Sequence, residues 1–151
     1  MTTGDAAWAG ERRPERAAAL LLEARSPRWV RRFGDELDRR LGASELEQVL
    51  AVWDLSQSDA ARMFGVSRQA VGKWLRSGVP AERSVAVADL GAATDLLVRY
   101  LRRERIPAVV RRPAAVTGGR SLLDVASVDP GAALDAVRAM FDFAAVSSGA
   151  N

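Results

Sequence analysis

The pattern of apolar and polar positions is helical along almost the whole chain, and it is clearest over residues 55–75. Apolar residues there recur at spacings of one, three and four, as they do on one face of an α-helix. Gly65 interrupts the pattern after Phe64, where glycine readily adopts the positive φ that ends a helix. The pattern resumes with Val71 and Trp74. We therefore predict two short helices joined by a tight turn.

Polar residues stand where the two predicted helices begin. Ser56 and Asp59 are three positions apart, which is the spacing of a capping box. Ser67 is a favourable N-cap for the second helix. Ala61 is small, as a close crossing of the two helices requires. The arrangement is typical of a helix-turn-helix, whose second helix enters the major groove of DNA.

The polar side of this two-helix unit carries groups that suit DNA. The predicted DNA-binding residues are Gln57, Ser67, Arg68, Gln69, Gly72, Lys73 and Arg76. Arginine or lysine can bond guanine and glutamine can bond adenine, so we expect residues 67–69 and Lys73 at base edges. Gln57 and Arg76 would meet phosphates. The alternative is an ordinary helical hairpin whose polar face is solvated.

Two further helices are predicted before residue 42. The first runs from Pro14 to about residue 25, because proline suits the first turn of a helix. Ser26 and Pro27 then read as the N-cap and first position of the next helix. We expect Gly42 to end that helix.

Ser44 and Glu47 have the spacing of another capping box. They predict a separate support helix that turns Trp53 inward. Together with the two-helix unit it would complete a small three-helix core.

A long helix is predicted from Glu82 to about Glu104, after Gly78 and Pro80 stop the helix before it. Gly91 in its interior would let another helix pack closely. Its apolar stripe has nearly heptad spacing and consists of Val85, Ala86, Leu90, Ala93, Leu97, Tyr100 and Leu101. Such a stripe is either a dimer seam or a face that packs within its own chain, and the pattern leaves both open.

Charge changes sign toward the C-terminus. Residues 99–112 hold six arginines against one glutamate, which suits either contact with phosphates or an acidic partner, or else a solvated hinge. Residues 108–119 read as a loop or short extended segment. Residues 121–151 hold four aspartates against one arginine, so we do not expect them to face DNA. Capped helices should begin after Ser121 and at Asp129-Pro130.

Composition sets the class of protein. The 151 residues are 48% apolar and 6% aromatic, and together with the helical periodicity this predicts an all-α fold. The net charge of +3 mildly favours an anionic partner, and Lys73 is the only lysine. The chain has no cysteine and no histidine, which excludes disulfides, Cys/His zinc sites and Ser-His-Asp catalysis.

These absences shape the functional expectation. The chain also lacks a phosphate-cradling glycine loop, so we expect no enzyme, no catalytic residues, no metal and no cofactor. It has no apolar run of about 20 residues and no pattern of a signal peptide. We expect a cytoplasmic protein without a membrane partner.

Four parts are therefore expected along the chain. Residues 1–42 would form an N-terminal helical extension, with about the first 11 residues disordered. The helix-turn-helix DNA-binding domain would span 43–83. The long helix and a small C-terminal helical domain would span 84–145, and 146–151 would be a flexible tail.

This order of parts resembles that of the Xre/MbcA/ParS-like antitoxins. Three stretches carry the resemblance over residues 44–145: SQSDAARMFGVSRQAVGKWLRSGVP, IPAVVRRPAAVTGGRSLLDV and GAALDAVRAMFDF. Pro113 and the pair Gly118-Gly119 fit the loop of the family, whereas the tryptophan that the family usually carries near Val109 is absent. The resemblance implies a DNA-binding domain followed by a toxin-binding domain.

The family resemblance implies a function in two parts. The protein would be a homodimeric antitoxin that binds operator DNA, represses its own operon and neutralises a RES-type toxin that degrades NAD. The toxin would bind through residues 84–151, with 121–143 gripping it and 147–151 covering its active site. Two alternatives remain: a stand-alone or phage-type transcription regulator whose C-terminal domain dimerises, and an adaptor that uses the same scaffold to bind proteins.

Overall fold

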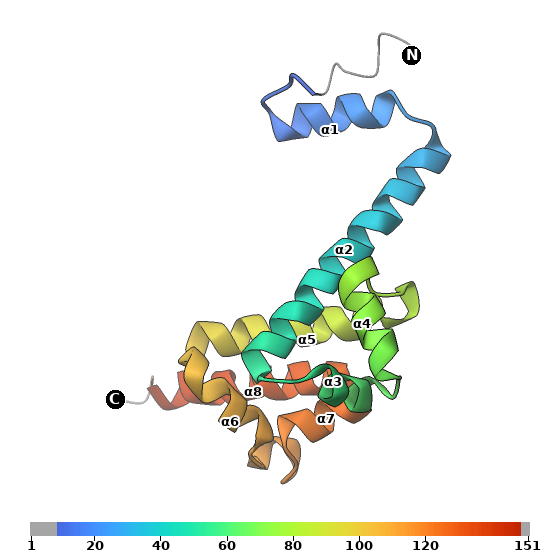
Figure 1. Ribbon diagram of the computed structural model, residues 1–151. Helices are drawn as coiled ribbons and strands as arrows, with labels where there is room; N and C mark the ends of the chain where they lie inside the picture. Colours follow the sequence, from blue (N-terminus) through green and yellow to red (C-terminus); the bar gives the residue numbers. More distant parts are fainter. Residues whose placement is uncertain (1–8, 149–151) are drawn as a thin grey trace. The chain divides into compact units, whose positions relative to one another are not determined.

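All regular structure in the described part of the chain is helical, which confirms the all-α class (Figure 1). The computed structural model describes residues 9–148, and the side chains of 9–142. Its elements are α1 (Pro14–Glu23), α2 (Pro27–Trp53), α3 (Gln57–Phe64), α4 (Arg68–Ser77), α5 (Ala81–Tyr100), η1 (Arg103–Arg105), α6 (Ile106–Arg111), η2 (Ala115–Thr117), α7 (Leu122–Val128) and α8 (Pro130–Ser148). Most of the segment predicted to be disordered, residues 1–8, lies outside the described residues.

The chain divides into two compact units, residues 1–37 and 38–151. In the first unit α1 begins at Pro14 as predicted, and none of its residues is buried. The Ser26 hydroxyl accepts the backbone N–H of Trp29 at 3.3 Å, as an N-cap does. The Trp29 ring stacks on Phe33 with centroids 5.0 Å apart. The predicted domain boundaries at 42/43 and 83/84 fall inside α2 and α5.

The predicted helix end at Gly42 is wrong. α2 is a single helix of 27 residues, and both Gly42 and Ser44 lie in its interior. Gly42 is buried, and a Cβ built there would lie 3.2 Å from the Cβ of Val79. The glycine therefore makes room for a packing contact. Spacing alone does not distinguish this use of glycine from a helix C-cap.

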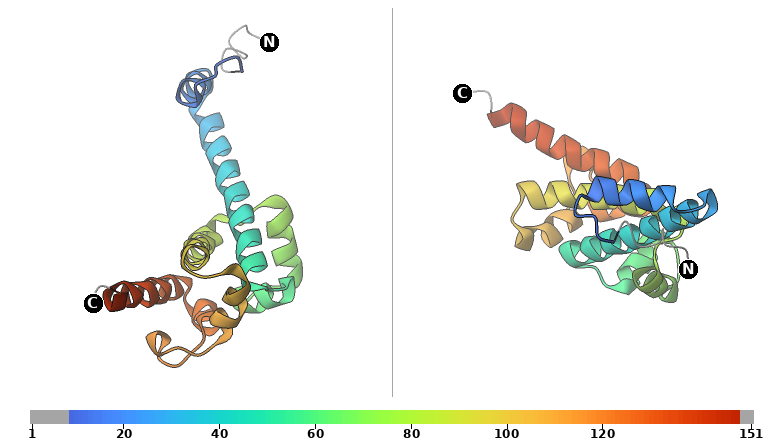
Figure 2. Two further views of the ribbon diagram at one scale, coloured as in Figure 1. Left: turned by 90° about the vertical axis from the view of Figure 1, so that its left-hand side faces the viewer. Right: turned by 90° about the horizontal axis from the view of Figure 1, so that it is seen from above.

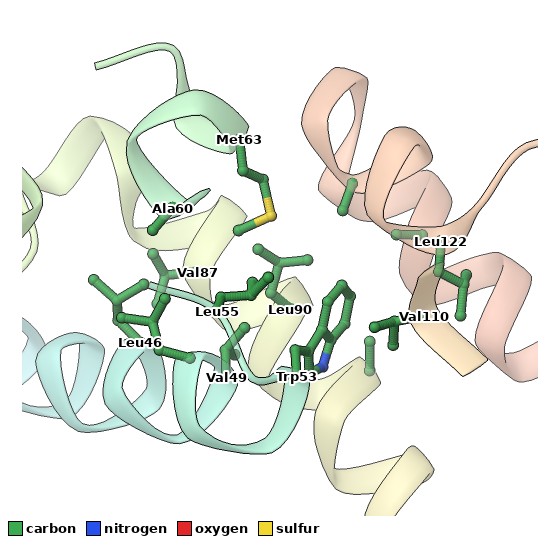
Figure 3. Packing of buried hydrophobic residues seen from close by; sticks show 14 of the residues in the cluster. Leu46, Val49, Trp53, Leu55, Ala60, Met63, Val87, Leu90, Val110 and Leu122 are labelled. Carbon is green, nitrogen blue, oxygen red and sulfur yellow. The ribbon is translucent and has the colours of Figure 1, made fainter. Parts of the chain in front are cut away.

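The core of the second unit is built around the C-terminal half of α2 (Figure 3). Trp53 is fully buried there, and its indole Nε1–H donates to the Thr94 hydroxyl of α5 at 2.9 Å. The Thr94 hydroxyl donates in turn to the Leu90 carbonyl at 2.7 Å. Both polar groups in the core thus have partners, as buried polar groups need.

The apolar stripe predicted for α5 is partly wrong. Leu90, Ala93 and Leu97 are buried, but Val85 is 72% exposed and Val87 is buried in its place. The buried face packs within its own chain, because α5 lies beside α8 (Figures 1 and 2) and bonds to α2. Of the two alternatives, a dimer seam or a face that packs within its own chain, the second therefore holds for the buried face of α5.

Gly91 has the role predicted for it. The residue is buried, and a Cβ built on it would lie 3.3 Å from the Glu45 side chain of α2. Tyr100, also predicted in the stripe, is 55% exposed and stacks on Phe141 of α8 with centroids 4.4 Å apart.

The segment predicted as a loop at residues 108–119 is largely helical, with α6 and η2 in it. Pro107 is in the first turn of α6, where no N–H partner is needed. Arg111 donates to the carbonyls of Trp53 at 2.8 Å and Asp54 at 2.7 Å, the last residue of α2 and the residue that follows it. This arginine of the basic stretch therefore satisfies carbonyls at a helix end.

The two C-terminal helices begin where predicted. The Ser121 hydroxyl accepts the N–H of Asp124 at 3.1 Å, and Asp129 Oδ1 accepts the N–H of Ala132 at 3.2 Å. α8 continues to Ser148, so residues 146–148 of the predicted flexible tail are helical. Residues 149–151 lie outside the described residues.

We expect Trp53→Phe and Thr94→Val to be less than additive in the free energy of unfolding. Thr94→Val leaves the buried Trp53 Nε1–H without its acceptor, which costs about 1–3 kcal/mol, whereas after Trp53→Phe the Thr94 hydroxyl keeps its bond to the Leu90 carbonyl. The double variant removes both groups, so it should cost about 1 kcal/mol less than the sum. Denaturant unfolding of the four proteins measures this, with Thr94→Ser as a control that keeps the hydroxyl. Strict additivity would contradict the coupling.

Candidate nucleic-acid interface

The turn between α3 and α4 has the local structure that the sequence predicts. The Ser56 hydroxyl accepts the N–H of Asp59 at 3.1 Å, and the Asp59 carboxylate accepts the N–H of Ser56 at 2.9 Å. Gly65 ends α3 with a φ of 64°. The Ser67 hydroxyl accepts the N–H of Ala70 at 3.1 Å and caps α4. Short-range hydrogen bonds therefore set the start of both helices.

Packing fixes which side of α4 faces outward. Val71 and Trp74 are buried, and the Trp74 ring meets Phe64 of α3 edge to face with centroids 5.6 Å apart. Ala61 of α3 is buried as well. Arg68 and Gln69 are exposed on the outer side.

The far end of α4 is held against α2. Gly78 follows α4 with a φ of 101°, and a Cβ there would lie 2.5 Å from the Cβ of Arg39. The N–H of Val79 points to the Arg39 carbonyl at 3.4 Å. Only glycine combines this backbone angle with this close approach.

Five of the seven predicted DNA-binding residues border one hollow of about 300 Å³ on the outer side of α4. They are Gln57, Arg68, Gln69, Gly72 and Arg76. Two carry guanidinium groups and two carry amides, and no carboxylate lines the hollow. The hollow therefore presents donors in excess, as an anionic, hydrogen-bonding ligand requires.

The prediction that Gly72 belongs to the exposed DNA-binding face is wrong. The residue is buried. A Cβ built on it would lie 3.2 Å from Arg76 Nη1 and 3.3 Å from Gln57 Oε1. Gly72 thus offers no side chain to a ligand, and it lets the side chains of Arg76 and Gln57 approach the helix closely.

The two remaining predicted residues, Ser67 and Lys73, do not border this hollow. Ser67 is exposed, and its hydroxyl already accepts a hydrogen bond as the cap of α4. Lys73 borders a second hollow, of about 360 Å³. That hollow is lined by Arg39, Ala70, Lys73, Trp74, Ser77, Gly78 and Pro80.

Arg39 was missed in the sequence because it lies on a helix face where arginines alternate with acidic residues. Such a face is usually solvated. In the sequence, Gly78 indicated only the end of a helix. Its close approach to Arg39 is a contact of the tertiary structure, which the sequence does not display.

Asp59 has the one shifted pKa resolved near this site. Hydrogen bonds from the Ser56 backbone and hydroxyl, and then from the Arg62 guanidinium, hold the pKa of Asp59 at about 2, below its ordinary value of 3.8. The carboxylate is therefore ionised at neutral pH. It accepts a hydrogen bond from the Ser56 N–H at the N-terminus of α3, and it does not line the hollow.

No group of three or more acidic, histidine or cysteine residues is placed to hold a metal ion within the described part of the chain. None of the helices described here has the length and apolar character needed to span a membrane. Comparison of the chain with protein-family models, curated proteins and solved structures finds no match.

We expect the capping carboxylate to make stability depend on pH in the acid range. Because the pKa of Asp59 is lower in the folded protein, its contribution is fully present above about pH 4 and is lost as the pH falls toward 2. Asp59→Asn should therefore lower the midpoint of thermal unfolding at pH 6, with the gap to wild type closing between about pH 4 and pH 2. A gap that stays constant with pH would contradict this.

Proposed function

We propose that this protein binds double-stranded DNA and reads its sequence with α4 in the major groove. The observation that carries the proposal is the hollow on the outer side of α4, where Gln57, Arg68, Gln69 and Arg76 converge without a carboxylate. An α-helix with its side chains is about 10–12 Å wide, and the major groove is about 12 Å wide. The fit of size and charge favours a duplex.

Positions along the helices suggest which groups contact bases. Arg68 and Gln69 occupy the first turn of α4 and are exposed. In helix-turn-helix proteins the N-terminal residues of the second helix contact base edges. We infer that Arg68 bonds a guanine and Gln69 an adenine.

Gln57 and Arg76 suit the other role, contact with phosphates. Gln57 is the first residue of α3 and carries an amide that can donate to a phosphate oxygen, and Arg76 is in the last turn of α4. Both side chains reach the Gly72 position, from two different helices. Contacts of this kind would set the register of the protein on the duplex.

We expect Arg68→Ala and Arg76→Ala to weaken binding in different ways. Duplexes selected from a randomised pool by the wild type supply the test sequence and its single-base variants. Arg68→Ala should relax discrimination at one base position by about 1–3 kcal/mol. Arg76→Ala should weaken all sequences about equally and lower the salt slope by about 1.

Two outcomes would contradict this scheme. Uniform loss of affinity in both variants would refute the division between base and phosphate contacts. No selection from the pool would refute sequence reading. No salt-dependent binding to any duplex would refute DNA binding itself and favour the adaptor alternative.

We also propose a homodimer, because helix-turn-helix proteins commonly read two half-sites. The apolar face of α5 is used within its own chain. A dimer would therefore form through another surface. The molecular mass of the protein in solution shows whether a dimer is present.

The family resemblance adds a second hypothesis, neutralisation of a toxin by the C-terminal part. Its support in the structure is apolar surface left exposed there: Val128 of α7 is 77% exposed, and Val98 and Tyr100 of α5 are exposed as well. A protein-binding surface would bring such side chains together in one contiguous apolar patch. α7 and α8 cannot simply be deleted to test this, because Leu122 and Val137 belong to the core.

We expect the product of the adjacent gene to copurify with the full-length chain when the two are co-expressed. Val128→Asp should weaken that complex, because it places a charge on an exposed apolar position, while DNA binding is retained. Ser127→Asp, on the exposed neighbouring residue, is the matched control. If the chain purifies alone and the neighbouring product is harmless to cells, the antitoxin hypothesis fails and the transcription regulator remains.

A further inference from the structure

We propose that the second hollow, between Arg39 and Lys73, binds a backbone phosphate of the DNA duplex. This inference rests on the proposed function and adds a contact that the sequence pattern does not reveal. The hollow of about 360 Å³ is bordered by α2, α4 and Pro80, the residue that precedes α5. Its lining contains two cations and the Ser77 hydroxyl, and no carboxylate.

The two cations are available to a ligand. Arg39 and Lys73 are both exposed, and within residues 9–142 neither forms an ion pair. Two uncompensated positive charges that border one concave site attract an anion. A phosphate group with its several acceptor oxygens can take hydrogen bonds from a guanidinium and an ammonium group together.

The backbone holds Arg39 in this place. Gly78 approaches Arg39 so closely that any Cβ at position 78 would lie 2.5 Å from the Arg39 Cβ. The neighbouring Val79 N–H points to the Arg39 carbonyl. The root of the Arg39 side chain is therefore fixed beside the end of α4, and only the outer part of the side chain has to be ordered on binding. This limits the entropic cost of the contact.

The two hollows lie on neighbouring sides of α4. Arg68, Gly72 and Arg76 line the first, and positions 70, 73, 74 and 77 line the second, which at 3.6 residues per turn is a different side of the helix. A helix in the major groove has a phosphate backbone along each rim of the groove. We assign Gln57 and Arg76 of the first hollow to one rim and the second hollow to the other, while Arg68 and Gln69 keep the base contacts proposed above.

This assignment changes the role of Lys73. The sequence pattern places it at a base edge, whereas in the structure it lines the same hollow as Arg39. A lysine ammonium is a compact point charge that suits a phosphate and carries little base discrimination there.

The test measures the salt dependence of DNA binding by the full-length chain, on a duplex selected by the wild type. Each lost phosphate contact lowers the slope of log affinity against log salt by about 0.9. Arg39→Ala and Lys73→Ala should each show this change, so that raising salt from 50 to 200 mM weakens their binding about three- to fourfold less than that of wild type. Both should keep the base preferences of the wild type.

Two further variants serve as controls. Arg39→Lys keeps the charge and should restore most of the slope. Arg138→Ala removes an arginine on α8 that pairs with Asp135 at the surface, and it should leave the slope unchanged. Alanine at position 39 retains the Cβ that contacts the Gly78 region, and far-UV circular dichroism with a thermal melt verifies folding.

The outcomes separate this inference from the proposed function. If wild type binds with a steep salt slope and Arg39→Ala leaves that slope unchanged, or alters base preference, the phosphate site is refuted while DNA binding stands. If wild type shows no salt-dependent binding to duplex DNA, the proposed function and this inference fall together.

Discussion

The buried hydrogen bond between Trp53 and Thr94 is the constraint on which the second unit depends. It joins the end of α2 to the middle of α5 inside an apolar core, where a missing partner would be costly. Arg111 of α6 donates to two carbonyls at the same end of α2, those of Trp53 and Asp54. The end of α2 is thus held to α5 and α6, which follow it by more than 25 residues, and the C-terminal helices pack around them.

The second half of α2 also positions the candidate interface. Glycines let other parts of the chain approach this helix closely at three places. Val79 packs against Gly42 of α2, Gly91 of α5 packs against Glu45 of α2, and Gly78 lies against Arg39 of α2. The first and third of these contacts hold the segment that follows α4. The orientation of α4 therefore depends on contact with α2 as well as on its packing against α3.

The surface of α4 joins two features that a DNA-reading helix needs. The first hollow is lined by amide and guanidinium groups that can discriminate bases or bind phosphates. The second is lined by two cations, Arg39 and Lys73, and we assign no base contact to it. Neither contains a carboxylate, so the positive charge of this side is not cancelled locally. Acidic residues of the C-terminal helices, such as Asp124 and Asp135, lie outside both linings.

The sequence by itself determined the features that depend on near neighbours. The capping box at Ser56, the turn at Gly65 and the starts of α4, α7 and α8 follow from hydrogen bonds across about three residues, which a linear pattern displays. Tertiary structure alone decided that α2 continues through Gly42, that α5 buries Val87 instead of Val85, and that Lys73 and Arg39 line one hollow. These features depend on contacts between residues more than thirty positions apart, and hydrophobic periodicity carries no information about which distant side chain occupies a given space.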